Sequence, residues 1–408
     1  MSSTLSTPAA PPRRPTAAPA PQSPLAKLGL KGRALTWANW IAVAILVYLL
    51  ITAVSVIGAG FKSATGGEAE RLFAFAENPL IALMIGVITT ALIQSSSTVT
   101  SIVVGMVAGG LPMTTAIPML MGANIGTTLT STLVSLGMAR DKETFKRAFA
   151  AASVHDMFNL LAVVIMLPLE LTTHVLERLS GFFAGQLAGT DGGVFAAVFG
   201  GLGNVVTSTT KPLSELIQAS VSGLTPVWGG LVLIMVGVVL ILASINYIGV
   251  LLKVLMVGKA KEVMCNSVGR SPASGMVAGL LLTVLVQSSS TTTSLIVPLA
   301  GAGTFNLKQV YPFTLGANVG TTVTALIAAF AFSGPTAALA LQAALVHCLY
   351  NVIALIIIYG LPFLRPLPIK GAELLAHFGS KSKFYVAAWV LGVFLVLPGS
   401  LIALTVLL

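Results

Sequence analysis

Residues 93–101 read IQSSSTVTS, and residues 286–294 read VQSSSTTTS. Each stretch is followed by a second motif, Gly-Ala-Asn-x-Gly-Thr-Thr, at residues 122–128 and 316–322. A single Gln-Ser-Ser-Ser motif would carry little information. Two copies that are each followed by the same second motif indicate that a larger unit occurs twice in the chain.

A third motif, His-x-x-x-Asn, closes each copy at residues 155–159 and 347–351. Equivalent residues lie 193, 194 and 192 positions apart, measured on the motif glutamines, the motif asparagines and the histidines. The spacing of the motifs therefore differs between the two halves only by insertions or deletions of one or two residues. Polar patches that are interrupted by glycine and paired across two halves of a membrane protein are the best sequence pointer to a transport site.

The composition defines the class of protein. Of the 408 residues, 56% are hydrophobic and 8% are charged, and the mean hydropathy is +0.96. A water-soluble domain would have about a quarter of its residues charged. Apolar stretches exceed the roughly 20 residues that a spanning helix needs and lack the alternation of a membrane β-barrel. The sequence therefore predicts an all-α polytopic membrane protein, and we assign the net charge of +10 to topology signals rather than to nucleic-acid binding.

The N-terminal residues, the cysteines and the glycosylation acceptors bear on the cellular location of the protein. Residues 2–24 are rich in Pro, Ala and Ser, and we expect a disordered cytoplasmic tail rather than a signal peptide. Cys265 and Cys348 provide neither a disulfide framework nor a metal-binding spacing. The sequence contains no Asn-x-Ser/Thr acceptor, which favours a multi-pass protein of a bacterial inner membrane, the plasma membrane of such a cell.

Basic residues set the orientation of the predicted helices. Five of them precede the first span at 35–60, which places the N-terminus in the cytoplasm by the positive-inside rule. The loop after the first Gly-Ala-Asn motif has four Lys and Arg residues between 140 and 147, whereas the matching loop at 331–338 has no charge. The two copies therefore face opposite sides of the membrane, which predicts an inverted-topology repeat.

Each half is expected to contain a spanning helix, a re-entrant Gln-Ser-Ser-Ser hairpin, a helix unwound at its Gly-Ala-Asn motif, and a last spanning helix. The expected segments of the first half are 35–60, an amphipathic stretch at 62–77, the hairpin 79–109, and the spans 112–137 and 144–169. Those of the second half are 227–256, a basic stretch at 258–270, the hairpin 273–303, and the spans 307–330 and 338–362. A final span at 384–406 leaves the C-terminus outside by this count.

The chain is accordingly divided into five parts: a disordered N-terminal tail (1–33), repeat 1 (34–169), an external linker (170–226), repeat 2 (227–364), and a C-terminal part (365–408) with an amphipathic stretch and the final span.

The repeated motifs have the chemistry of an ion site. A helix can be broken inside a bilayer only where it faces protein or a water-filled cavity. Free helix N-termini offer N–H donors to an anion, while carbonyl and hydroxyl oxygens suit a hard cation such as sodium. Neither motif contains a Lys or Arg in either copy. A bound anion would therefore be neutralised mainly by co-bound cations, which makes coupling between the two ions obligatory.

Simpler interpretations apply to several of these residues. Ser and Thr in membrane helices often bond only the carbonyl four residues earlier, although the duplication argues against this for the paired motifs. His155 and His347 are interpreted as hydrogen-bonding residues between packed helices. Asp141 fits a solvated cluster of charges. Asp156 lies within a span, where a carboxylate usually marks an ion pathway, and its counterpart in the second copy is the neutral Cys348.

These motifs resemble those of the type II sodium-dependent phosphate cotransporter family, including its bacterial members. The resemblance covers roughly residues 75–360 and includes DKETFKRAFAAASVHDMFN at 141–159 and YPFTLGANVGTT at 311–322, in family order. It implies an inverted-repeat fold that binds divalent phosphate and sodium at the two Gln-Ser-Ser-Ser regions. The family is usually described with a cytoplasmic C-terminus, which the span count does not reproduce.

The motifs and the resemblance together assign individual residues, none of them catalytic. The residues expected to bind phosphate are Gln94, Ser95, Ser96, Asn124, Gln287, Ser288, Ser289 and Asn318. The residues expected to bind sodium, the only metal expected, are Thr127, Thr128, Gln287, Ser288, Thr321, Thr324, Asp141, Asp156 and Asn159. By the resemblance, Asp156 matches the acidic residue of the electrogenic members, whereas Met138 and Ala317 stand where other members have polar residues.

Three functions remain to be compared. The first is a sodium-coupled symporter that imports phosphate by alternating access, and the second is a similar symporter for another oxyanion or a dicarboxylate. The third is a membrane-embedded enzyme or a channel. An enzyme would need a nucleophile with a base in reach, and the two histidines are offset from the serine motifs. We therefore expect no enzyme and no organic cofactor, with phosphate, sodium and the lipid bilayer as partners and no nucleic acid, and we leave a homodimer open.

Overall fold

The computed structural model describes residues 23–66, 78–127, 129–188 and 193–407, which form helices joined by short turns, without strands. In the first half the helices are η1 (Pro24–Leu28), α1 (Gly32–Thr65), α3 (Pro79–Ile93), α4 (Ser96–Ala108), α5 (Met113–Gly126), α6 (Leu129–Leu136), α7 (Lys142–Thr173), α8 (Val175–Ala188) and α9 (Gly193–Ala219). In the second half they are α10 (Pro226–Ser267), α11 (Pro272–Val286), α12 (Ser289–Gly301), α13 (Leu307–Ala329), α14 (Pro335–Gly360), α15 (Pro366–Lys381), α16 (Lys383–Leu391), η3 (Gly392–Val396) and α17 (Leu397–Leu407).

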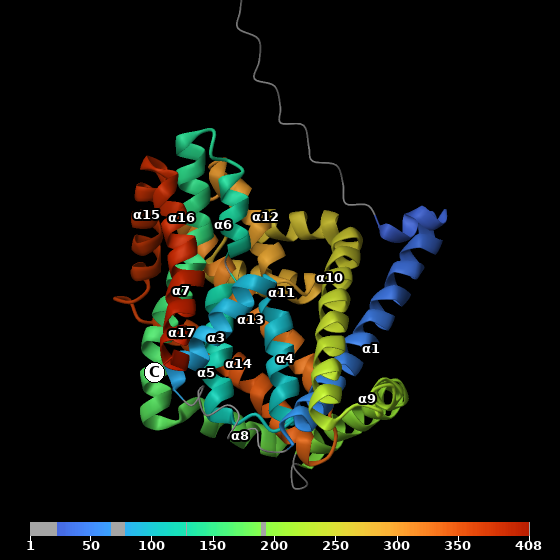
Figure 1. Ribbon diagram of the computed structural model, residues 1–408. Helices are drawn as coiled ribbons and strands as arrows, with labels where there is room; N and C mark the ends of the chain where they lie inside the picture. The colour runs from blue at the N-terminus through green and yellow to red at the C-terminus, as the bar shows by residue number, and fades with distance from the viewer. Residues whose placement is uncertain (1–22, 67–77, 128, 189–192, 408) are drawn as a thin grey trace, which may run out of the picture.

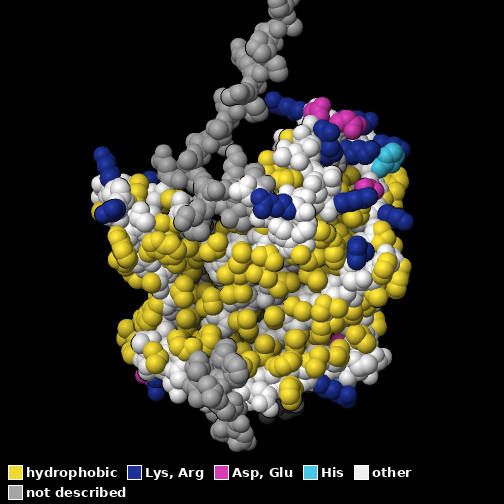
Figure 2. All heavy atoms as spheres, turned by 180° about the vertical axis from the view of Figure 1, so that it is seen from behind, with side chains coloured by type: hydrophobic (Ala, Val, Ile, Leu, Met, Phe, Trp, Pro, Cys, Tyr) yellow, Lys and Arg dark blue, Asp and Glu magenta, His cyan; other side chains and the backbone are white. Residues whose placement is uncertain are grey.

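Six helical segments in the described part are long and apolar enough to cross a membrane, which confirms the all-helical membrane class. They are α1, α7, Pro226–Leu255 of α10, α13, Thr336–Gly360 of α14, and Lys383–Thr405 at the C-terminal end. On the face shown in Figure 2, a band of apolar side chains crosses the middle of the molecule, and Lys and Arg gather mainly at one end. This distribution is the one that a bilayer around the middle would favour.

Both Gln-Ser-Ser-Ser stretches form helical hairpins with the same local geometry. The first hairpin joins α3 to α4 through Gln94 and Ser95, and the second joins α11 to α12 through Gln287 and Ser288. The two glutamines have left-handed backbones, with φ of 56° and 55°. Each following serine is extended and caps the next helix by accepting a hydrogen bond from the backbone N–H three residues later. The two copies of the motif therefore have nearly the same backbone dihedral angles at the glutamine and at the serine that follows it.

The Gly-Ala-Asn motifs behave differently in the two copies, and half of the sequence expectation is wrong. In the first copy α5 ends at Gly126 and α6 begins at Leu129, so the chain departs from one continuous helix at the motif. In the second copy α13 continues as a regular helix through the whole motif. The expected unwinding there is incorrect because the motif glycines allow close helix packing instead of breaking the helix.

The close packing follows the repeat residue by residue. A Cβ atom added to Gly86 would overlap the carbonyl oxygen of Met119, and one added to Gly122 would overlap that of Leu83. In the second copy, the same overlaps join Gly279 to Phe313 and Gly316 to Met276. Each hairpin is thus locked backbone to backbone against its own Gly-Ala-Asn helix, α3 against α5 and α11 against α13.

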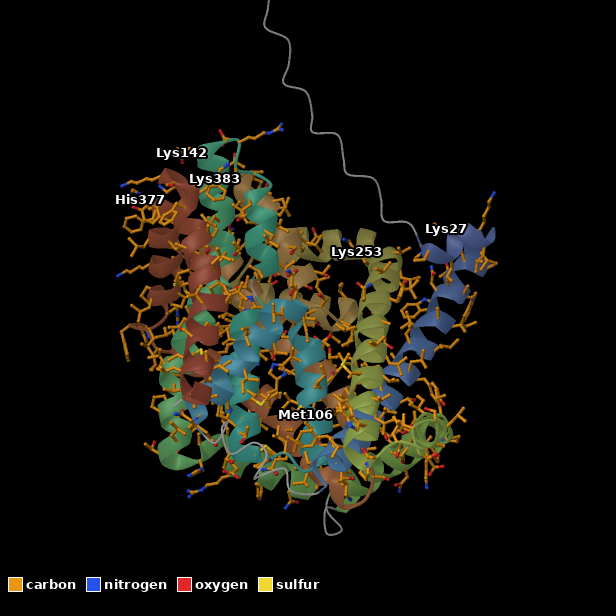
Figure 3. The ribbon with its side chains drawn as sticks, viewed as in Figure 1. Lys27, Met106, Lys142, Lys253, His377 and Lys383 are labelled. Atoms are coloured by element: carbon orange, nitrogen blue, oxygen red, sulfur yellow. The ribbon has the colours of Figure 1, made fainter. Side chains whose placement is uncertain are left out.

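The two hairpins point toward opposite ends of the molecule. Met106, near the end of α4, lies in the lower half of Figure 3, whereas Lys142, His377 and Lys383 lie at the top. The end of α12 lies at the upper end, because Gly301 accepts a hydrogen bond from Arg147 near the start of α7. In Figure 1, α1 descends to the lower end, from which α10 rises.

The remaining segments differ in part from the sequence expectation. The linker at 170–226 contains two helices, α8 and α9, which lie at the lower end of Figure 1. Residues 1–22 of the expected tail and 67–77 of the expected amphipathic stretch lie outside the described residues. The expected disorder does not extend to residue 33, because the Ser23 hydroxyl caps η1 and donates a 2.7 Å hydrogen bond to Asn39. From Lys383 at the upper end, α16, η3 and α17 run back toward the lower end (Figures 1 and 3).

Replacement of Gly316 by alanine should destabilise the protein by about 1–3 kcal/mol, because the new methyl group would force α13 away from the backbone of α11. Thermal unfolding of the detergent-purified protein measures this. The control is Gly185→Ala in α8, where a Cβ atom meets nothing within 4 Å and alanine is the better helix former. Equal unfolding temperatures for the two variants would contradict the proposed packing role.

Candidate functional site

Each hairpin tip presents the N-terminus of a short helix together with serine hydroxyls. Ser95 Oγ accepts hydrogen bonds from the N–H of Thr98 at 3.2 Å and from its hydroxyl at 2.8 Å. Ser288 Oγ accepts from the N–H of Thr291 at 3.2 Å. Gln94 is exposed, whereas Ser96 is only 4% exposed. The tips therefore concentrate donors and hydroxyl oxygens at a helix end where an anion would be favoured.

The second hairpin tip is closed onto the helix that follows it. Gln287 Oε1 accepts a hydrogen bond of 3.0 Å from the Thr324 hydroxyl of α13, and Gln287 Nε2 donates to the Val284 carbonyl at 2.6 Å. The structure thus brings Gln287 and Thr324 together beside Ser288, and the assignment of these three residues to sodium stays a prediction. The equivalent of Thr324 in the first copy is Thr130, for which no hydrogen bond to Gln94 is present in the described part of the chain.

The second hairpin also contacts the first repeat directly. The Ser290 hydroxyl donates to the Thr127 carbonyl at 3.3 Å, at the break after α5. In α6, the Ser131 hydroxyl lies 2.9 Å from that of Thr293 in α12. The expected sodium residue Thr127 is therefore near the second tip, although its own hydroxyl donates to Ala123 within α5. Thr128 lies outside the described residues.

A buried asparagine network joins the two repeats at the centre of the bundle. Asn159 of α7 donates to the backbone carbonyl of Asn124 at 2.8 Å and accepts from Asn318 Nδ2 at 3.0 Å. The three side chains are at most 2% exposed. Asn124 and Asn318, which were expected to bind phosphate, therefore lie in the same network as Asn159, which was expected to bind sodium.

The two histidines extend this network symmetrically. His347 Nε2 lies 3.4 Å from Asn124 Oδ1, so the histidine of repeat 2 contacts the motif asparagine of repeat 1. The ring of His155 in repeat 1 faces Asn318 of repeat 2, and its Nε2 atom has no hydrogen-bond partner of good geometry among the described residues. Each histidine thus faces the motif asparagine of the other repeat, which agrees with the interpretation as residues between packed helices.

Asp156 lies one residue after His155 and is 1% exposed. Neither of its carboxylate oxygens has a hydrogen-bond partner in the described part of the chain. The indole of Trp389 in α16 faces this carboxylate, and its Nε1 atom is also unpartnered among the described residues. A buried carboxylate without a partner is costly, and a bound cation would satisfy it.

The structure separates Asp141 from this centre, so the two aspartates cannot share one ion. Asp141 is exposed and caps α7 by accepting a 2.7 Å hydrogen bond from the Thr144 N–H. The Thr144 side chain and then this N–H lower the pKa of the Asp141 carboxyl. Fifteen residues of helix separate it from Asp156, or about 22 Å at roughly 1.5 Å per residue. This helix-capping role was not among the predictions from the sequence.

Two further residues that were assigned from the sequence, and two threonines that were not, lie buried near the motifs. Thr321 is buried and donates to the Ala317 carbonyl, and Ser289 is 3% exposed at the start of α12. Thr90 and Thr283 were not expected, yet both hydroxyls are buried and unpartnered among the described residues. They lie 193 residues apart in the sequence, so the repeat period was a signal that could have identified them.

A cluster of possible metal ligands at the end of α7 is explained by local structure. Glu170, His174 and Glu177 place ligand atoms within 4.8 Å of one another. Glu170 accepts hydrogen bonds from the Leu176 and Glu177 N–H groups at 2.6 and 3.1 Å, and thereby caps α8. His174 Nδ1 lies 3.2 Å from Glu177 Oε2. These contacts explain why the three side chains lie together: they stabilise the turn between α7 and α8.

The fold and site define a helical membrane protein built on a duplicated unit of hairpin and helix. The chain belongs to the Na+/Pi-cotransporter family, whose model matches residues 49–188 and 240–363. This confirms the family resemblance that the motifs indicated.

Relatives with assigned names support the same membership. The chain is 31% identical to sodium-dependent phosphate transport protein 2A of Rattus norvegicus, with 86% of this chain and 65% of the relative covered. It is 33% identical to the 2A protein of Ovis aries (88% and 66% covered) and 28% identical to the 2B protein of Homo sapiens (90% and 66% covered). The chain thus spans about two thirds of the length of these relatives. No solved structure matches it.

The asparagine network offers a test that uses the repeat as its own control. Asn159→Ala should destabilise the protein by roughly 1–3 kcal/mol for each group it leaves unpaired, namely Asn318 Nδ2 and the Asn124 carbonyl. Asn351→Ala should lower the stability less, because the one hydrogen bond that the Asn351 side chain makes among the described residues is its donation to the His347 carbonyl one turn earlier. Thermal unfolding in detergent distinguishes them, and an equal loss in both variants would count against the inter-repeat role of Asn159.

Proposed function

We propose that the protein imports inorganic phosphate together with sodium by alternating access, with the two hairpin tips forming the substrate site. The family membership and the names of the relatives support the pair of ions. The tips support the site, because both offer a helix N-terminus and serine hydroxyls. We place the protein in the plasma membrane, which in a bacterial cell is the inner membrane.

The observation that carries the proposal is the unequal closure of two equivalent tips. Gln287 is tied to Thr324 on a continuous helix, whereas Gln94 is exposed beside a helix that ends at Gly126. The same unit therefore adopts two local conformations in one molecule. If the repeats are inverted, as the opposite directions of the two hairpins support, exchange of these conformations would open the site to the other side of the membrane.

The absence of basic residues supports obligatory coupling. No Lys or Arg occurs in either pair of motifs, so phosphate at the tips would be held by hydroxyl and N–H donors. Sodium ions at Gln287, Ser288 and Thr324 would supply the missing positive charge. Divalent phosphate would then need at least two sodium ions for neutrality, and neither ion would bind well alone.

Uptake of labelled phosphate into proteoliposomes tests this function. Uptake should require an inward sodium gradient, and phosphate should bind more tightly as sodium rises, by the same factor that phosphate tightens sodium binding. Replacement of sodium by choline provides the control, and excess sulfate distinguishes phosphate from another oxyanion. Phosphate binding that is unchanged in choline would refute the coupling.

The second tip can be tested against a serine that only caps a helix. Ser288→Ala removes both a cap and a proposed ligand, whereas Ser271→Ala removes only the cap at the other helix of the same hairpin, where Ser271 accepts from Ser274 N–H at 3.1 Å. We expect about 5–150-fold weaker phosphate affinity for Ser288→Ala, corresponding to roughly 1–3 kcal/mol. Ser271→Ala should keep wild-type affinity. Equal uptake kinetics in both variants would remove Ser288 from the site.

We also propose that Asp156 binds one additional sodium ion, since its carboxylate is buried and unpartnered among the described residues. A third sodium with divalent phosphate would carry one net positive charge inward, worth about 2.3 kcal/mol per 100 mV. Asp156→Asn should then retain sodium-dependent uptake but lose phosphate-evoked current in voltage-clamped proteoliposomes. Cys348→Ala, at the equivalent position of repeat 2, should retain the current. Undiminished current in Asp156→Asn would exclude this role.

A further inference from the structure

A charged cavity of about 690 Å³ lies away from the hairpin tips, between the start of α7, the turn from α12 to α13, and α15. Its charged and titratable lining residues are Glu143, Lys146, Arg147, Lys370, Glu373 and His377. The remaining wall is mostly apolar and includes Phe305 and Leu374. A volume of this size lies within the usual range for binding sites of small ligands.

The charges that line the cavity are not satisfied by one another. Three Lys and Arg side chains line the cavity with two carboxylates, so the lining has one more Lys or Arg charge than carboxylate charge. The ion pairs found within 4.0 Å in the described part of the chain are His174–Glu177 and Lys211–Glu215, both elsewhere. Arg147 is held in place by its 3.1 Å hydrogen bond from Nε to the Gly301 carbonyl, and its guanidinium also interacts electrostatically with Asp141, which lies outside the cavity lining.

The cavity lies at the end of the molecule where basic residues gather. Lys142, His377 and Lys383 lie together at the upper end of Figure 3, and Figure 2 shows Lys and Arg there beyond the apolar band. By the positive-inside rule this end is cytoplasmic. Exposed apolar side chains of α15, Leu367 at 43% and Leu374 at 59%, adjoin this region. An amphiphilic ligand could place its charged group in the cavity and its apolar part beside α15.

We propose that this cavity binds a phosphate-bearing anion at the cytoplasmic end, either the headgroup of an anionic phospholipid or free phosphate. Basic pockets between membrane helices on the cytoplasmic side suit such groups. Lys146 and Arg147 come from repeat 1, the start of α13 comes from repeat 2, and Lys370 comes from the C-terminal part. A ligand bound to all three would resist movement of the repeats, so the site is regulatory and distinct from the transport site.

Binding to the purified full-length protein in a neutral detergent and sodium-free choline buffer tests this inference. Under the coupling proposed above, the transport site stays weak without sodium, so binding at the cavity is read separately from transport. The probes are inorganic phosphate and dihexanoyl phosphatidylglycerol, with phosphate-free dihexanoylglycerol as the reference compound. Titration calorimetry gives the affinity, and the unfolding temperature without ligand shows whether each variant folds.

The decisive variant is Lys146→Ala with Lys370→Ala, and its matched control is Lys142→Ala with Lys383→Ala, which removes the same charge from the same end outside the cavity. We expect the cavity variant to bind at least about tenfold more weakly than wild type, and the control to bind as wild type does. Lys146→Arg with Lys370→Arg should retain binding and excludes misfolding as the cause.

Binding of the phospholipid alone would identify a lipid headgroup as the ligand, and binding of inorganic phosphate would identify the free anion. Either result supports the site. The inference is overturned if neither probe binds wild-type protein, or if the cavity variant and its control bind with equal affinity. Sodium-dependent uptake is measured independently of this result, so failure of the cavity site leaves the transport proposal standing.

Discussion

The structure depends on one constraint: a chain that turns inside an apolar layer must satisfy its own backbone polar groups. At both tips a serine does this, because the oxygens of Ser95 and Ser288 accept the N–H of the third residue of the next helix. The preceding Gln94 and Gln287 take left-handed backbones, at a cost of about 1–3 kcal/mol each. A turn this tight aims the remaining N–H groups of α4 and α12 at the tip. Helix capping and the proposed anion chemistry thus arise from the same residues.

The glycine contacts determine which parts can move. Gly86 and Gly279 bring backbone against backbone, so each hairpin and its following helix form one rigid body. Between these bodies, hydroxyl contacts such as Ser290 with the Thr127 carbonyl accompany apolar contacts within one shared hydrophobic core. Polar contacts between hydroxyls can be exchanged for others at small net cost, since each is worth only about 1 kcal/mol.

The sequence predicted the all-helical membrane class, because apolar length and composition are local signals, whereas the inverted repeat stays a prediction. The sequence did not predict that the second Gly-Ala-Asn helix is continuous, because a glycine permits both a break and a close contact, and only the neighbouring helix decides between them. Asn124 and Asn318 were recognised by their motif, but their common partner Asn159 depends on tertiary packing. Asp141 was assigned to sodium through a family resemblance. The long helix α7 places it far from Asp156, and this separation in space is not visible in a motif. The phosphate and sodium assignments themselves remain predictions.

The departures from symmetry explain why a duplicated molecule can still favour one state. Asn159 bridges both motif asparagines, while among the described residues its counterpart Asn351 bonds only within its own helix. Asp156 adds a charge where repeat 2 has Cys348. A protein with two identical halves would populate its two inverted conformations equally, and an ion could not bias one over the other except by its gradient. Differences worth a few kcal/mol at these two positions suffice to populate one conformation strongly in the absence of ligand. Under the proposal that Asp156 binds sodium, a cation at this carboxylate would change that balance, and the asymmetry between the repeats would give sodium a way to favour one conformation.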